Sequence, residues 1–138
     1  MPDRDDLLAS ARVAHLATAG RDGRPHVVPI CFVWRDGALY TPLDLKPKRR
    51  ADPRRLRRVR NLLENPRASV VVDRWDEDWS RLAYVLVEGP AALLEEGAER
   101  DAAEAALFTK YPQYRALPLA GRPIVRVRAE RVIFWPTD

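Results

Sequence analysis

The sequence predicts a mainly β fold, an antiparallel barrel or sandwich with helices appended to it. Six or so short segments rich in Val, Ile, Leu and aromatic residues are separated by turn-forming residues, as in small all-β domains. Two or three helical segments lie among them without the regular strand–helix alternation of a parallel sheet. The 138 residues are expected to form one domain, 1–138, because no linker or repeat divides them.

The first half of the chain is expected to hold a short helix and three strands. Acidic residues suit the first turn of a helix over residues 3–11, because they complement its dipole. Asp36 and Gly37 form a strong hairpin signal. Pro29 removes a backbone donor from the second strand, which therefore belongs at a sheet edge or a bulge. The predicted strands are 12–18, 25–34 and 38–41.

The second half begins with a basic loop and a helix. Asp52 can cap this helix and Pro53 suits its first position, so we expect it to run to about Asn65. A long strand is expected to bend at Gly89 and Pro90. The predicted strands are 68–74, 81–94 and 122–135, and an Ala-rich helix is predicted over 95–111.

The composition excludes several classes of protein and of site. The single cysteine, Cys31, rules out an internal disulfide and a cysteine-based zinc site, and in an apolar strand it is expected to be an inert core thiol. Two scattered histidines, His15 and His26, do not predict a metal site. No apolar run approaches the roughly 20 residues of a membrane span, and the acidic N-terminus lacks a secretory signal. A cytoplasmic protein without a membrane partner is expected.

A basic segment, residues 46–60, dominates the charge distribution. It carries a net charge of +8 in a chain whose total is +4, so the remainder is close to −4. Its only acid is Asp52, and its nine cations are Lys46, Lys48, Arg49, Arg50, Arg54, Arg55, Arg57, Arg58 and Arg60. An anionic partner is expected there.

The ordinary explanation of such a segment is the solvated face of an amphipathic helix. On a helical wheel Leu56, Val59, Leu62 and Leu63 share one face, and Arg54, Arg57, Arg58 and Asn61 lie opposite. However, Arg54 and Arg55 would lie in the first turn, where each cation costs about 0.3–1 kcal/mol against the helix dipole. A bound anion would offset that cost. The length of the segment favours a polyanion over a single phosphate.

Two other stretches are candidate ligand contacts. The strand around Pro29 would present free backbone groups to a flat ligand, with His26 at the mouth of that site. Trp75 and Trp79 flank three acids, and they are expected to stack on a planar ligand or to lie at a subunit interface. His26, Tyr40 and Tyr84 are possible proton donors, but no residue is identified as catalytic.

The order of these motifs resembles that of the split-barrel flavin and deazaflavin proteins related to pyridoxamine 5′-phosphate oxidase. Within that superfamily the chain is most similar to the short group of probable coenzyme F420-dependent enzymes. The stretches that carry the resemblance are 13–18 (VAHLAT), 23–29 (GRPHVVP), 38–41 (ALYT), 46–49 (KPKR), 61–68 (NLLENPRA), Gly89 and 111–114 (YPQY).

The resemblance implies a six-stranded antiparallel split barrel and a homodimer with two cofactors in clefts at the subunit interface. The residues implied to border the cofactor ring are His26, Val27, Val28, Pro29, Ile30 and Thr41. Those implied to grip the phosphate are Lys46, Lys48 and Arg49, which the charge argument extends to Arg54 and Arg55. Trp75 and Trp79 are implied to approach the ring or the dimer seam.

The resemblance and the charge together predict an oxidoreductase that transfers a hydride between coenzyme F420 and an unsaturated small organic substrate. FMN offers one terminal phosphate, whereas the deazaflavin carries a phosphodiester and a string of glutamates, which nine cations suit better. The alternatives are an FMN-dependent pyridoxamine phosphate oxidase-like oxidoreductase, a non-catalytic cofactor or haem-type carrier, and, least favoured, a basic nucleic-acid-binding module.

Overall fold

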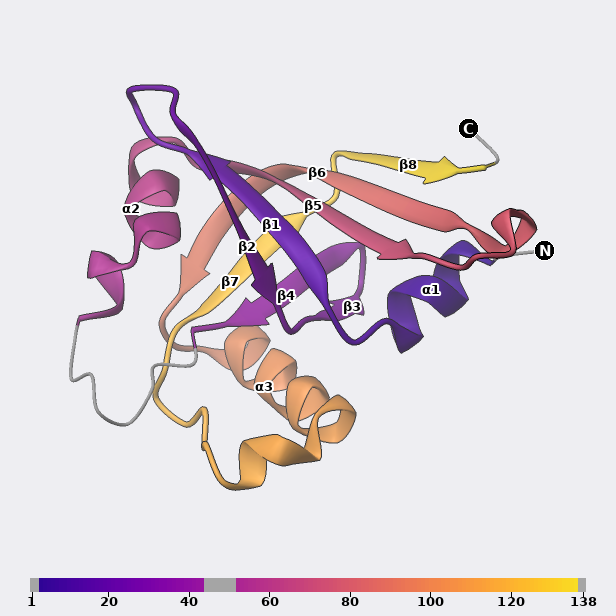
Figure 1. Cartoon of the computed structure of the whole chain (residues 1–138). Helices are drawn as coiled ribbons and strands as arrows, with labels where there is room; N and C mark the ends of the chain where they lie inside the picture. The colour runs from indigo at the N-terminus through magenta and orange to yellow at the C-terminus, as the bar shows by residue number, and fades with distance from the viewer. Residues whose placement is uncertain (1–2, 44–51, 137–138) are drawn as a thin grey trace.

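A computed structural model of the chain describes residues 3–43 and 52–136. These residues form a mainly β fold with appended helices, as predicted (Figure 1). The helices are α1 (Arg4–Ser10), α2 (Arg57–Glu64) and α3 (Ala98–Lys110), with short 3-10 turns η1 (Pro53–Arg55), η2 (Trp79–Arg81) and η3 (Pro112–Arg115). The strands are β1 (Ala14–Ala19), β2 (Pro25–Ile30), β3 (Val33–Arg35), β4 (Ala38–Pro42), β5 (Arg67–Arg74), β6 (Ala83–Leu94), β7 (Ile124–Arg128) and β8 (Arg131–Trp135).

The strands pair antiparallel in the order β2-β1-β5-β6-β7-β4-β3, and β8 pairs with the part of β6 whose other edge pairs with β5. The long strand β6 belongs to both halves of this sheet, because its first part pairs with β5 and β8 and its last part with β7. The crossing lies at Gly89, where a Cβ atom would stand 1.9 Å from the carbonyl oxygen of Arg128. Only glycine permits that approach, and the two halves form a split barrel.

Two buried clusters hold the fold together. The larger lies inside the barrel, and its ends are closed by Leu7 and Leu8 of α1 and by Val59 and Leu62 of α2. The smaller lies between α3, through Leu107, and the β3-β4-β7 part of the sheet, beneath which α3 lies in Figure 1. The outer face of the β2-β1-β5-β6-β8 part contributes little to either cluster.

Two predicted strands are each divided in two, so the six expected strands become eight. The predicted strand 25–34 separates into β2 and β3 at Cys31 and Phe32, and the predicted strand 122–135 separates into β7 and β8 at Ala129 and Glu130. Each division lets the chain pass between the halves of the barrel: β2 pairs with β1, whereas β3 pairs with β4.

The predicted basic helix is also interrupted. Asp52 caps as expected, accepting a hydrogen bond from the Arg54 amide at 2.9 Å, but the residues that follow form the 3-10 turn η1. Leu56 is extended, with φ −63° and ψ 135°, and α2 begins only at Arg57. The prediction that Arg54 and Arg55 occupy the first α-helical turn is therefore wrong. Arg57 and Arg58 occupy it instead.

The face of α2 that meets the barrel differs from the helical-wheel prediction. Leu63, expected to be buried, is 57% exposed, whereas Asn61, expected in solvent, is 2% exposed. The Asn61 amide donates to the Thr18 hydroxyl at 3.0 Å, and a Cβ on Gly20 would stand 2.9 Å from the Asn61 amide oxygen. The missing side chain at Gly20 lets α2 turn its Asn61 side toward β1.

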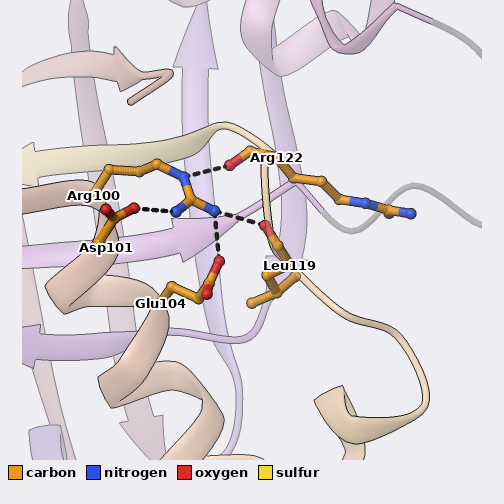
Figure 2. A network of polar contacts seen from close by, with 5 residues as sticks. All are labelled: Arg100, Asp101, Glu104, Leu119 and Arg122. Carbon is orange, nitrogen blue, oxygen red and sulfur yellow. Dashed lines mark hydrogen bonds and ion pairs between the residues drawn. The ribbon is translucent and has the colours of Figure 1, made fainter. Parts of the chain in front are cut away.

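A buried arginine joins α3 to the segment before β7 (Figure 2). The Arg100 guanidinium pairs with Asp101 and Glu104, each at 2.6 Å. It also donates to the carbonyl oxygens of Leu119 at 2.6 Å and Arg122 at 2.9 Å. The network anchors the connection between α3 and β7 to the first turns of the helix.

Candidate functional site

A pocket of about 310 Å³ opens where the end of β2 meets β4 and the first turn of α2. We call it the β2–β4 pocket. It brings together three of the predicted ring-bordering residues, Pro29 and Ile30 of β2 and Thr41 of β4. The full lining is Arg12, Val13, Pro29, Ile30, Cys31, Thr41, Pro42 and Arg58.

The lining combines an apolar wall with two guanidinium groups. Val13, Pro29 and Ile30 supply apolar surface, while Arg12 and Arg58 supply positive charge. Arg58 lies in the first turn of α2, whose preceding residue, Leu56, has no polar side chain to cap the free amides. An uncapped helix start is positive and suits an anion. The residues therefore fit a flat aromatic group with an anionic tail.

Strand β2 lies at one end of the strand order, which confirms the edge position predicted from Pro29. Along it His26, Val28 and Ile30 pair with inward-facing residues of β1, and Val27 and Pro29 point to the outer face. His26, Val27 and Val28 do not line the β2–β4 pocket. The predicted ring-bordering residues of β2 therefore lie on both faces of this strand.

The predicted phosphate-binding residues are only partly placed. Lys46, Lys48 and Arg49 lie outside the described residues. Arg54 forms an exposed ion pair with Glu95 at 2.8 Å, and Arg55 is exposed on η1. Neither lines the pocket, and among the described arginines of the basic segment the one that does so is Arg58.

A second concave surface, of about 330 Å³, lies on the other side of α2 against the β1–β2 turn. It is lined by Arg21, Asp22, Arg57, Arg60, Asn61 and Glu64. Arg57 stands 3.8 Å from Asp22, and the Glu64 carboxylate accepts from the Arg21 amide at 2.8 Å. The arginines of α2 therefore extend positive charge from the pocket around the helix.

Trp75 and Trp79 lie in the connection between β5 and β6, at the far end of the sheet from α2 in Figure 1. Their side chains are 66% and 70% exposed, and the Trp75 indole donates to Glu77 at 3.2 Å. They do not line the β2–β4 pocket of their own chain. Their assignment to a ligand or an interface stays a prediction.

Like His26, the other two possible proton donors, Tyr40 and Tyr84, do not line the pocket. Tyr40 neighbours Thr41 on β4 and so faces the opposite side of the strand. Its hydroxyl donates to Glu99 at 2.7 Å, and burial together with that carboxylate raises the pKa of Tyr40 to about 12. The bonds from Tyr40 and Arg126 lower the pKa of Glu99. Tyr84 stacks on Trp135, with ring centroids 6.1 Å apart.

Sequence reasoning missed several pocket residues. Cys31 was expected in the core, but it is partly exposed on the pocket wall, because the chain leaves the sheet between β2 and β3. Arg58 was placed on the helix face opposite Val59 and Leu62, because the helical wheel did not foresee that α2 buries its Asn61 side. Pro42 was also missed, and its position directly after Thr41 in the sequence was the signal that could have identified it.

Among residues 3–43 and 52–136, no three His, Cys, Asp or Glu side chains converge as metal ligands would. In the same part of the chain no helix combines the length and apolar character needed to span a bilayer.

The family model for pyridoxamine 5′-phosphate oxidase matches residues 2–136. The chain belongs to this family. The motifs that suggested the resemblance, from 13–18 to 111–114, all lie within the matched range. No curated protein matches the chain in sequence.

Solved structures of this family's fold resemble the chain over most of its length. A conserved hypothetical protein from Mycobacterium tuberculosis is 24% identical with a TM-score of 0.76, covering 98% of this chain and 84% of its own. The heme storage protein HutZ from Vibrio cholerae is 18% identical with a TM-score of 0.73, covering 94% and 89%. An FAD-binding protein from Mesorhizobium loti is 24% identical with a TM-score of 0.70, covering 94% and 87%. At such identities these likenesses show the split-barrel fold alone.

Proposed function

We propose that this chain is a cytoplasmic oxidoreductase that binds coenzyme F420 and transfers a hydride between it and an unsaturated organic substrate. The observation that carries the proposal is the β2–β4 pocket, in which an apolar wall adjoins Arg58 at the uncapped start of α2. When bound, the deazaflavin supplies the hydride chemistry, and the protein binds and orients it.

Different residues of the pocket bind different parts of the cofactor. Pro29, Ile30 and Thr41 border the cofactor ring and exclude water from its edge. Arg58 and the free amides of the first turn of α2 hold the anionic group. Arg12 adds a second positive charge at the rim.

The choice of F420 over FMN rests on the extent of positive charge. FMN carries one terminal phosphate, which Arg58 and the helix start would satisfy. Arg54 and Arg55 lie before α2, and Arg57 and Arg60 lie on its far side, beyond the reach of one phosphate in the pocket. A tail with a phosphodiester and several carboxylates offers these cations anionic groups in addition to Glu95 and Asp22, which already lie beside Arg54 and Arg57.

FMN is the alternative cofactor. Membership of the pyridoxamine 5′-phosphate oxidase family favours it, and the similarly folded Mesorhizobium loti protein is FAD-binding. A haem-type carrier is the second alternative, because HutZ shares the fold.

We also propose that the protein is a homodimer, joined through the outer face of the β2-β1-β5-β6-β8 sheet. A row of residues in register crosses all five strands: Pro29, His15, Val71, Leu86 and Ile133. On the same face Val27 is 63% and Trp135 40% exposed, and none of these apolar side chains belongs to a buried cluster. Because Pro29 also lines the pocket, a second copy on this face would reach the cofactor site.

The test is a side-by-side titration of purified, cofactor-free protein with coenzyme F420, FMN and haemin, followed by absorbance and fluorescence. We expect F420 to bind more tightly than FMN, with an affinity that falls as salt is raised. Tighter binding of FMN supports the flavin alternative, and saturable binding of haemin alone supports the carrier. Steeply salt-dependent binding of random DNA in place of every cofactor supports the nucleic-acid module. Sedimentation at micromolar protein reports the dimer, and a monomer would contradict it.

A further inference from the structure

The junction between β2 and β3 needs hydrogen-bond partners from outside the sheet. The register of β2 with β1 ends at Ile30, and that of β3 with β4 begins at Val33. Phe32 lies between them and is fully buried, so its backbone N–H and C=O cannot turn to water. Buried backbone groups of this kind are almost always paired.

The partners come from the C-terminal end of α3, almost 80 residues further along the chain. The Phe32 amide donates to the Tyr111 hydroxyl at 3.1 Å, and the Lys110 ammonium donates to the Phe32 carbonyl at 3.0 Å. The Tyr111 hydroxyl lies 3.0 Å from the carbonyl oxygen of Arg12 and 3.2 Å from that of Phe32. A hydroxyl has one proton, and the carbonyl oxygen of Phe32 already accepts a hydrogen bond from Lys110. We therefore assign the Tyr111 hydroxyl proton to the bond with the carbonyl oxygen of Arg12.

The network thereby joins the two backbone stretches that form one wall of the β2–β4 pocket. Arg12 and Val13 precede β1, Ile30 and Cys31 end β2, and all four line the pocket. Tyr111 and Lys110 do not line it. The guanidinium of Arg12 also lies over the Tyr111 ring, 4.5 Å from its centroid, so the same tyrosine holds that side chain.

We propose that Tyr111 and Lys110 are positioning residues for the cofactor pocket, because they fix the distance between the Arg12–Val13 and Ile30–Phe32 stretches of its wall. The identity of the ligand rests on the proposed function, whereas the geometry of the wall does not.

Cys31 provides a readout that is independent of any cofactor. It is the only cysteine in the chain, it is partly exposed, and it lies on the wall that the network holds. Its rate of alkylation by iodoacetamide therefore reports how often the wall opens.

The experiment compares Tyr111→Phe with Tyr114→Phe in the full-length protein. Both tyrosines are 5% exposed and belong to the same buried cluster, but Tyr114 lies in η3 and lines a different pocket from the β2–β4 pocket. We expect Tyr111→Phe to raise the alkylation rate of Cys31 about fivefold and to weaken F420 or FMN binding by a similar factor, as loss of one or two hydrogen bonds would do. Tyr114→Phe should change both by less than about twofold, even where its melting temperature falls equally.

Lys110 is tested by conservative rescue. Lys110→Met removes the donor to Phe32, whereas Lys110→Arg retains one, so Met should raise the Cys31 rate and Arg should leave it near the wild-type value. The proposal is overturned if Tyr111→Phe leaves the Cys31 rate unchanged, or if Tyr114→Phe moves it equally. If wild-type protein binds neither cofactor, the proposed function fails, and the Cys31 rates still decide the role of the network.

Discussion

Two groups of arginine side chains in this chain differ in what surrounds them. Arg100 is 4% exposed and makes four contacts of 2.9 Å or less, with two carboxylates and two carbonyl oxygens (Figure 2). The arginines of η1 and α2 are more exposed. Arg54 pairs with the exposed carboxylate of Glu95, and Arg57 lies 3.8 Å from that of Asp22. Arg55 and Arg60 are exposed.

The difference teaches how charge is used for stability and for binding. A cation buried for structure must find acceptors within its own chain, because an unpaired buried charge is costly. A cation kept for a ligand is left at a surface where the ligand supplies the acceptors. Arg100 follows the first pattern, and the proposed function assigns the second to the exposed Arg55 and Arg60.

The largest effect is expected at Arg100. Arg100→Met should lower the free energy of unfolding by about 3 kcal/mol, since it removes the bonds to Leu119 and Arg122 and leaves two carboxylates without their cation. Urea denaturation measures this, with Arg115→Gln on the exposed η3 turn as the control. Because Arg100 does not line the pocket, cofactor affinity should hold at temperatures where the variant is folded. A loss of cofactor affinity without a loss of stability would mean that Arg100 serves binding and not stability.

The next effect is expected at Arg58. Arg58→Gln should weaken binding of the cofactor by about 10- to 100-fold, the value of one charge-assisted hydrogen bond, and should change the unfolding free energy by about 1 kcal/mol or less. The measurements are a fluorescence titration and a denaturation curve on the same sample, with the exposed Arg4→Gln as the control. An affinity equal to wild type would remove Arg58 from the anion site.

Part of this arrangement was predictable from local sequence. The Asp36–Gly37 hairpin, the edge position of β2 and the cap at Asp52 each depend on a few adjacent residues, and each was predicted correctly. The crossing at Gly89 was anticipated as a bend because glycine and proline both weaken a central strand.

The rest depends on contacts between residues far apart in the sequence. The break between β2 and β3 is stabilised by Tyr111, 79 residues from Phe32, so no window around Cys31 could reveal it. Arg100 looks like any charged residue on an Ala-rich helix, and only the carbonyls of Leu119 and Arg122 mark it as buried. Arg58 shares a side of α2 with Asn61, and only the contact between Asn61 and Thr18, 43 residues away, marks that side as the one that meets the barrel.

Lys110 adds a third case to this comparison, because it is a half-buried cation with no carboxylate partner among residues 3–43 and 52–136. Its ammonium donates to the Phe32 carbonyl and lies 3.8 Å from the centre of the Phe32 ring. Burial, with Arg12 nearby, lowers the pKa of Lys110 to about 8, and the proximity of Cys31 opposes this shift. Arg100, which has two carboxylates, keeps its charge, whereas Lys110 is poised to lose its charge in mildly alkaline solution.

The smallest effect is therefore a pH dependence of stability. The folded pKa of Lys110, about 8, lies below its ordinary value of 10.5, so the unfolded chain holds more protons between these two values. Stability should then rise with pH across that interval, and Lys110→Met should remove the rise. Because the amine is only half-buried, we expect a difference of about 1 kcal/mol between wild type and variant over pH 7.5 to 10, well below the full value of the shift. Equal slopes in urea denaturation across this interval would mean that Lys110 titrates as a solvated lysine, and that burial without a carboxylate costs this cation nothing.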